Sequence, residues 1–241
     1  MRFNGKDVRD VHGRISVNSE ILPGAAAREI DYVEGRAGAV AAGVRYKPDE
    51  YRARINIASF NRNEAREIRA LLAGWAASSG EKTAKLEPTY WKGKAYDAIL
   101  KSVSAPEFVR GFATVDIVWS TPYPFARDLT VSRASGSGGA VVMIGGTHAC
   151  RPMIRQTVET TADMLTIVMD GGSVLGIKNV NAGDVIEMDV EHESLTINGM
   201  HAEEKINFSR TDWHAKFVPG RHEILSSDGG LLEVSWRNEW E

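Results

Sequence analysis

Residues 51–57 read YRARINI and place an apolar side chain at every odd position. Alternation with a period of two residues predicts a β-strand that buries one face and wets the other. Residues 113–119, ATVDIVW, repeat this pattern with Val115, Ile117 and Trp119 on one side. Two such strands predict a sheet that packs one face against a core.

One amphipathic helix is predicted between these two strands. Asn61 followed by Glu64 is typical of a capping box, in which each residue satisfies a backbone amide near the helix start. The apolar residues that follow recur at helical spacing, and the run ends at residues 78–80, SSG. These residues are Ala65, Ile68, Leu71, Leu72 and Trp75.

The second half of the chain has no helical pattern and predicts an all-β sandwich. Asn198-Gly199 is its strongest hairpin signal, because this dipeptide suits the tight turn between antiparallel strands. Short apolar runs recur between turn residues at 153–158, 164–169, 174–177, 185–190, 195–197 and 231–236.

A domain boundary is predicted where Gly and Ser dominate, in residues 132–139, SRASGSGG. This composition is typical of a flexible linker. We therefore expect two domains, residues 1–130 and 131–241. Residues 1–127 hold 20 basic and 15 acidic side chains, whereas residues 128–241 hold 9 basic and 17 acidic ones. The basic residues of the first half are scattered singly, which favours solvated surface over a nucleic-acid patch.

The sequence predicts no disulfide, no signal peptide and no membrane-spanning segment. The single Cys150 cannot form an intramolecular disulfide, and residues 1–5 lack the apolar core of a signal peptide. No run of about 18 apolar residues occurs, so no membrane-spanning segment is predicted. The chain is expected to be made in a reducing cytoplasm.

No catalytic, cofactor-binding or metal-binding residue is predicted. The six histidines never take the spacing that places two of them on one helix face or beside cysteines. The acidic residues between Asp184 and Glu193 alternate with apolar ones, as on the wet side of a strand. Cys150 has no evident histidine partner, so we interpret it as an inert thiol.

The ordered set of short motifs resembles the distal tail protein (Dit) family of siphophages from end to end. In the first half the resemblance is carried by residues 3–7 (FNGKD), 33–38 (VEGRAG), 54–57, 71–75 (LLAGW), 96–98 (YDA) and 122–125 (PYPF). In the second half it is carried by residues 179–184, Asp189, 195–199 (LTING), 217–220 (FVPG) and 233–236.

The resemblance implies a mainly β, two-domain fold. The first domain would be a tail-tube-like β-sandwich or split barrel with one α-helix, and the second a galectin-like jelly roll. It implies a structural virion protein, not an enzyme, that forms a hexameric ring at the tail tip. Its partners would be the tail tube protein, the tail-tip hub or tail-associated protein, and receptor-binding or baseplate proteins. DNA would only pass through the lumen, and the chain would be made in the host bacterial cytoplasm.

If the chain forms a ring, residues 33–51 are a candidate for subunit contact. This stretch is rich in Gly and Ala and carries the candidate interface residues Arg36, Arg45, Tyr46 and Tyr51. Tyr and Arg are enriched in protein interfaces.

Two other functions stay open on the sequence alone. Six tryptophans could offer sugar-stacking platforms, and Trp213 and Trp240 are the candidates for a carbohydrate-binding module of a tail or cell-surface assembly. A glycan-degrading enzyme would need two opposed carboxylates in a cleft.

Overall fold

A computed structural model describes residues 1–24, 27–32, 39–45, 48–59, 61–109 and 111–241. The chain divides into two compact units, one of residues 1–127 with Glu241 and one of residues 128–240. The division falls close to the boundary expected from the sequence.

The first unit is a sheet with one helix, and its strands follow the order β2-β1-β7-β8-β10-β6-β3, with β9 beside β10. In chain order the elements are β1 (Arg2–Phe3), β2 (Lys6–Asp7), the short 3-10 helix η1 (Val8–Asp10), β3 (Ile15–Ile21), β4 (Ala27–Tyr32), β5 (Ala39–Arg45), β6 (Asp49–Ile57), α1 (Arg62–Ala76), β7 (Ala84–Glu87), β8 (Lys94–Val103), β9 (Glu107–Val109), β10 (Phe112–Thr121) and β11 (Ala126–Asp128).

The two strands predicted from alternation form the centre of this sheet. β6 and β10 run antiparallel over nine residue pairs from Ala113↔Ile57 to Thr121↔Asp49. Every second residue of both strands is buried, as predicted. At the edge, β3 pairs with β6 and carries a bulge between Val17 and Ser19. A bulge in an edge strand hinders pairing with a foreign strand.

The predicted helix is confirmed as α1, with Asn61 as its N-cap. The Asn61 side chain accepts a hydrogen bond from the Asn63 amide. The capping box is wrong in its second half, because Glu64 accepts from the Ser59 hydroxyl and pairs with Arg14. The Ser59 hydroxyl instead accepts from the Asn61 amide. Leu71, expected on the apolar stripe, is 53% exposed.

An aromatic cluster forms the core between α1 and the sheet. Trp119 on β10 lies at its centre, with ring centroids 5.7 Å from Phe3, 5.9 Å from Trp75 and 6.0 Å from Tyr51. Tyr51 in turn contacts Tyr96 at 6.0 Å. All five residues are buried. Aromatic rings from β1, β6, β8 and β10 thus pack with Trp75 of α1 in one connected cluster.

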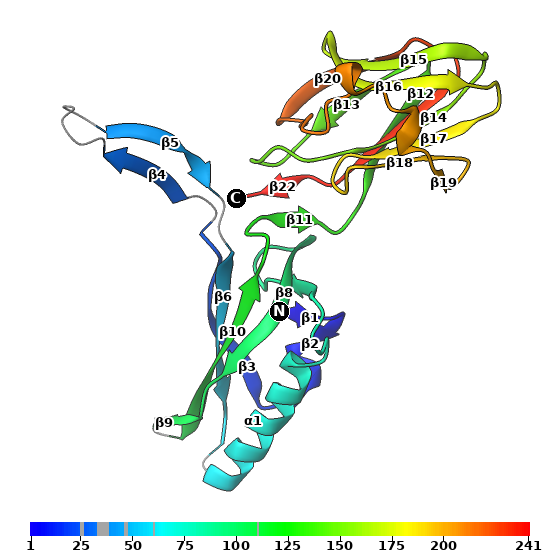
Figure 1. Ribbon diagram of the computed structural model, residues 1–241. Helices are drawn as coiled ribbons and strands as arrows, with labels where there is room; N and C mark the ends of the chain where they lie inside the picture. The colour runs from blue at the N-terminus through cyan, green and yellow to red at the C-terminus, as the bar shows by residue number, and fades with distance from the viewer. Residues whose placement is uncertain (25–26, 33–38, 46–47, 60, 110) are drawn as a thin grey trace. The chain divides into compact units, whose positions relative to one another are not determined.

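Strands β4 and β5 form a two-stranded sheet of their own. They pair antiparallel from Ala27↔Arg45 to Tyr32↔Ala39. Figure 1 shows this hairpin in blue, apart from the larger sheet of the unit. The backbone of these strands is described, and their side chains are not.

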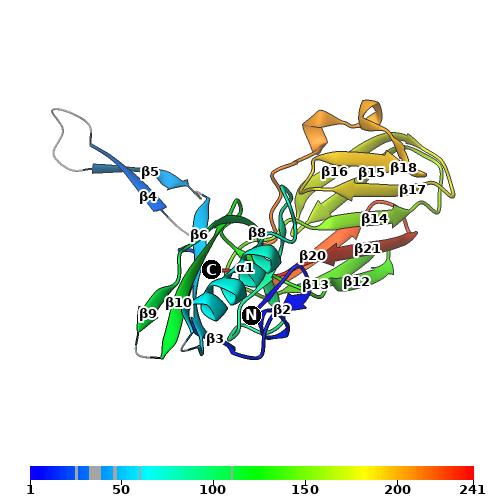
Figure 2. The same ribbon diagram turned by 90° about the horizontal axis from the view of Figure 1, so that it is seen from below.

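The second unit is a β-sandwich. One sheet has the order β12-β21-β14-β17-β18-β19 and the other has the order β13-β20-β15-β16 (Figures 1 and 2). The elements are β12 (Ser132–Ser137), β13 (Gly139–Ile144), β14 (Met153–Thr157), β15 (Ala162–Met169), β16 (Gly172–Val180), β17 (Val185–Asp189), β18 (Ser194–Ile197), β19 (Met200–His201), β20 (Gly220–Ser226), β21 (Leu231–Trp236) and β22 (Glu239–Trp240), with the 3-10 helices η2 (Glu203–Lys205) and η3 (Phe208–Arg210).

The predicted Gly/Ser linker is wrong. Residues 132–137 form β12, which pairs with β21 over six residues from Ser132↔Trp236 to Ser137↔Leu231. A strand needs backbone partners more than it needs large side chains, and β21 supplies those partners. Residues 139–144 form β13, which pairs with β20.

The mainly β fold predicted from the sequence is confirmed. The sandwich core holds apolar residues of both sheets, among them Val142, Ile167, Leu175 and Phe217. In the described part of the chain, α1 is the one α-helix and no sheet closes into a barrel. No described helix is long and apolar enough to cross a membrane.

Candidate interaction surfaces

Ion pairs lie on the solvent face of the first unit's sheet, both between strands and along β6. Arg54 donates two hydrogen bonds to Asp116, at 2.7 and 2.8 Å, from directly opposite positions on β6 and β10. The hydrogen bond to Arg54 lowers the pKa of Asp116. Glu50 similarly binds both Arg52 and Lys101. Each charged side chain of this set lies against one of opposite charge, and Glu50 is shared by two cations.

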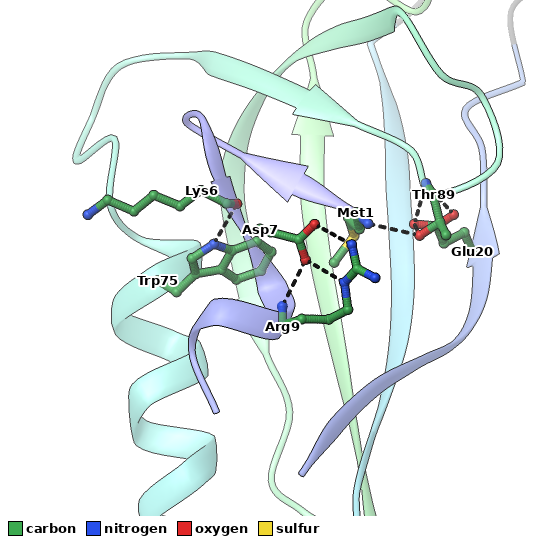
Figure 3. A network of polar contacts seen from close by, with 7 residues as sticks. All are labelled: Met1, Lys6, Asp7, Arg9, Glu20, Trp75 and Thr89. Atoms are coloured by element: carbon green, nitrogen blue, oxygen red, sulfur yellow. Dashed lines mark hydrogen bonds and ion pairs between the residues drawn. The ribbon is translucent and has the colours of Figure 1, made fainter. Parts of the chain in front are cut away.

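A polar network ties the start of the chain to the sheet (Figure 3). The Met1 amino group donates to the Thr89 hydroxyl at 3.0 Å, and this hydroxyl donates to Glu20 at 3.0 Å. The Thr89 amide also donates to Glu20, which joins the β7–β8 connection to β3. Burial, and then the Glu20 carboxylate, raise the pKa of Tyr51.

A second part of this network fixes β2 and η1. Arg9 donates to Asp7 through both its guanidinium and its amide. The Arg9 side-chain hydrogen bond holds the pKa of Asp7 well below its usual range. Trp75 on α1 donates to the Lys6 carbonyl at 3.1 Å (Figure 3). These contacts attach the N-terminal strands to the helix and give the network a structural role.

The β9–β10 hairpin presents apolar side chains to solvent. Phe108, Val109 and Phe112 are 38%, 48% and 37% exposed. Val109 lies directly opposite Phe112, and the Arg62 guanidinium lies 5.4 Å from the centre of the Phe108 ring. Exposed apolar clusters of this kind are typical of protein contact sites.

A buried histidine joins two turns of the second unit. His222 Nδ1 lies 2.6 Å from Asp170 Oδ2, and its Nε2 lies 2.7 Å from the Val218 carbonyl oxygen. Its ring stacks on Phe217 with centroids 5.6 Å apart. Burial opposes protonation of His222, but the bonds to Asp170 and Val218 outweigh it and raise its pKa. No local sequence pattern indicates this pair, because Asp170 and His222 lie 52 residues apart.

The Asp228 carboxylate joins two turns of the second unit through hydrogen bonds. Asp228 accepts hydrogen bonds from the amides of Glu159, Thr160 and Gly230 and from the Gln156 side chain. Burial opposes ionisation of Asp228, yet these bonds leave its pKa lowered. Their geometry makes Asp228 a structural anchor.

The structure describes the predicted subunit-contact residues to different extents. Arg36 and Tyr46 lie outside the described residues. Arg45 ends β5, and its side chain is also outside the description. Tyr51 is wrong as an interface residue, because it is fully buried against Trp119 in the core. The alternation of residues 51–57 already indicates that the Tyr51 side chain lies on the buried face of the strand.

The late tryptophans are buried or partly buried. Trp236 is buried, and Trp213 packs partly buried against the sandwich core. Trp240 is also partly buried and donates to Asp128 at 2.8 Å. Trp75 and Trp119 are core residues, as predicted.

Within the described residues, no group of three His, Cys, Asp or Glu side chains could hold a metal ion. His192 pairs locally with Asp189 at 2.7 Å, and His201 pairs locally with Glu203 at 3.0 Å. Cys150 is buried in the core of the second unit.

Comparisons with known proteins identify the second unit. Residues 145–240 match the family model SPP1_Dit, described as the siphovirus-type tail component, C-terminal domain. This domain is therefore that of a phage tail component. The match covers residues 145–240, and with the shared fold of the SPP1 Dit protein it confirms the resemblance to the distal tail protein family.

The fold of the whole chain is similar to a solved phage protein. The crystal structure of the SPP1 Dit (gp 19.1) protein, described as a paradigm of the hub adsorption apparatus in Gram-positive infecting phages, matches with a TM-score of 0.80 and 14% identity over 99% of this chain and 98% of that one. At this identity the match shows a shared fold.

A phage P2 baseplate structure in its activated conformation with Ca matches with a TM-score of only 0.45 and 10% identity over 94% of this chain and 91% of that one. No curated protein sequence matches the chain.

Proposed function

We propose that this chain is a structural protein of a siphovirus-type tail that forms a hexameric ring at the distal end and joins the tail tube to baseplate and receptor-binding proteins. The match of residues 145–240 to a tail-component domain carries the proposal. The fold shared with the SPP1 Dit protein along nearly the whole chain supports it. The role is mechanical and requires no catalysis.

The β4–β5 hairpin supports assembly through the first unit. An isolated two-stranded hairpin is marginally stable in water, because it lacks a further strand or a helix to cover it. β4 and β5 pair with each other and with no other described strand. We infer that a neighbouring subunit covers this hairpin in the ring. A ring requires such a heterologous contact, in which one surface meets a different surface on the next copy.

The assembled mass tests this function. Light scattering of the purified chain over a range of concentrations, with electron microscopy of the same fractions, should show a ring of six copies with an open lumen. Replacing residues 27–45 by a short Gly/Ser turn should leave both cores folded and yield monomers. A full-length chain that stays monomeric at every concentration, alone and with tail tube protein, would contradict the proposal.

A matched variant controls for general surface disruption. Arg54→Ala and Asp116→Ala remove a cross-strand pair from the same unit without touching the hairpin. If these variants dissociate the ring as completely as the hairpin replacement does, the hairpin is not the specific contact.

A further inference from the structure

The outward face of the six-stranded sheet in the second unit holds a hollow of about 450 Å³. β12, β21 and β14 form its floor, because the register places their outward side chains in adjacent rows. One row runs Arg133, Ser235, Met153, and the next runs Ser135, Glu233, Arg155 and then Glu187 on β17.

Arg155 is the centre of the hollow's polar network. Its guanidinium lies 2.5 Å from Glu233 and 3.3 Å from Glu187, so one cation is shared by carboxylates on both neighbouring strands. The three side chains remain 41% to 44% exposed. Ion pairs this exposed contribute little to stability, so their hydrogen-bonding atoms can exchange partners with a ligand.

The charge balance of the hollow restricts the ligand. The lining holds Arg133 and Arg155 as well as Glu233, so a ligand of either net charge meets a like charge as well as an opposite one. The lining is too polar and too open for a largely apolar ligand, which needs an enclosed apolar pocket. A neutral ligand with many hydrogen-bonding groups is repelled by neither charge and needs no enclosed apolar pocket.

Neighbouring hydroxyls on a sugar ring fit this arrangement chemically. Each hydroxyl donates one hydrogen bond and accepts others, a guanidinium only donates, and a carboxylate only accepts. An arginine beside a glutamate can therefore satisfy both hydrogen-bonding functions of two adjacent hydroxyls. Met153 is 45% exposed and offers an apolar thioether to the C–H face of the ring.

We propose that this hollow binds a neutral saccharide, with Arg155 and Glu233 holding two adjacent ring hydroxyls and Met153 lying under the ring. Ser135 and Ser235 supply hydroxyls in the neighbouring positions. This site is distinct from the tryptophan platform considered from the sequence. It does not depend on ring assembly.

Met153 provides a direct reporter for the test. The full chain labelled with ¹³C-methyl methionine is titrated with methyl glucoside, methyl galactoside and myo-inositol, and with cyclohexanol as a six-membered ring that lacks adjacent hydroxyls. The Met153 methyl signal should shift with at least one polyhydroxylated ring. Met143, on β13 of the other sheet and 64% exposed, should stay unchanged.

Variants separate specific binding from surface effects. Glu233→Gln and Arg155→Lys should weaken saccharide binding about tenfold, since Gln removes the charge of the acceptor and Lys lacks the planar set of donors of a guanidinium. Arg54→Lys alters a similarly exposed cross-strand pair in the first unit and should leave binding unchanged. Unchanged methyl signals of Met188, which is buried in the sandwich core, show that each variant is folded.

Three outcomes overturn the proposal. The first is a Met153 methyl signal that does not shift with any of the polyhydroxylated rings. The second is an equal response to cyclohexanol, which assigns the hollow to apolar ligands. The third is a Met153 signal that responds only on self-association or to a tail protein, which assigns the face to protein contact. A Glu233→Gln variant that loses saccharide binding but keeps the assembled mass of the wild type separates this result from the ring proposal.

Discussion

His222 lies with its Nδ1 2.6 Å from the Asp170 carboxylate while its Nε2 faces the Val218 carbonyl at 2.7 Å. Both neighbours are acceptors, and a neutral imidazole has one N–H to donate. Both hydrogen bonds therefore form together only when His222 is an imidazolium. Protonation of this one ring joins the β15–β16 turn to the loop before β20.

The stability of the second unit should fall as pH rises above neutrality. The folded-state pKa of His222 lies above its ordinary value of 6.5, so its stabilisation is complete below that value and is lost as pH rises through the folded pKa. Backbone and His222 hydrogen bonds lower the pKa of Asp170 from 3.8, so its share is lost only as pH falls through that lower value.

Urea unfolding from about pH 5 to pH 9 measures this effect. His222→Gln should cost about 1 kcal/mol at the acid end and progressively less toward the alkaline end. His201→Gln is the control, because His201 pairs with Glu203 on the surface and is 80% exposed. A cost of His222→Gln that does not change with pH contradicts the imidazolium assignment.

Gly230→Ala should destabilise the second unit by about 3 kcal/mol. A Cβ at this position would lie 2.0 Å from the Thr157 carbonyl oxygen and 2.7 Å from Asp228 Oδ2, so the turn must open. Gly183→Ala is the control, since nothing lies within 4 Å there and its cost of about 1 kcal/mol reflects its φ of +88°. Equal costs in thermal unfolding would show that steric contact at Gly230 is not decisive.

Trp119→Ala should cost about 4 kcal/mol of unfolding free energy, because it empties the centre of the aromatic cluster. Tyr90→Ala removes an aromatic side chain that is 83% exposed and should change stability by less than about 0.5 kcal/mol. Denaturant unfolding followed by tryptophan fluorescence compares the two. A small loss for Trp119→Ala would mean that the cluster tolerates a cavity.

Hydrogen exchange should distinguish the strand at residues 132–137 from a linker. In an edge strand the amides that point toward β21 exchange slowly and those that point outward exchange quickly, so protection alternates along β12. Uniformly fast exchange across Ser132–Ser137 would restore the linker interpretation and contradict the pairing with β21.

Local sequence patterns predicted the elements whose formation depends on their own residues. The alternation around Ile55 and Val115 and the helical spacing before Trp75 each reflect burial of one face, so these elements were found. The same alternation placed Tyr51 in the core, although its residue type had suggested an interface position. Periodicity was the better guide than residue type.

Pairings distant in sequence could not be predicted. β12 was missed because its side chains are small and its identity as a strand comes from backbone bonds to β21. The His222–Asp170 pair and the hollow around Arg155 likewise arise only when separate strands come into register. Their residues look like ordinary polar surface when they are read along the chain.

The pairing of β12 with β21 also sets an order of events during synthesis. β12 leaves the ribosome early in the second unit, yet its partner, Leu231–Trp236, is translated close to the last of the unit's strands. Ser132–Ser137 must therefore wait, unpaired, through most of the unit's translation. A segment of small polar residues is poorly suited to aggregation with other nascent chains. The Gly/Ser composition, which makes this strand resemble a linker in the sequence, thus protects the unpaired segment from aggregation until β21 emerges.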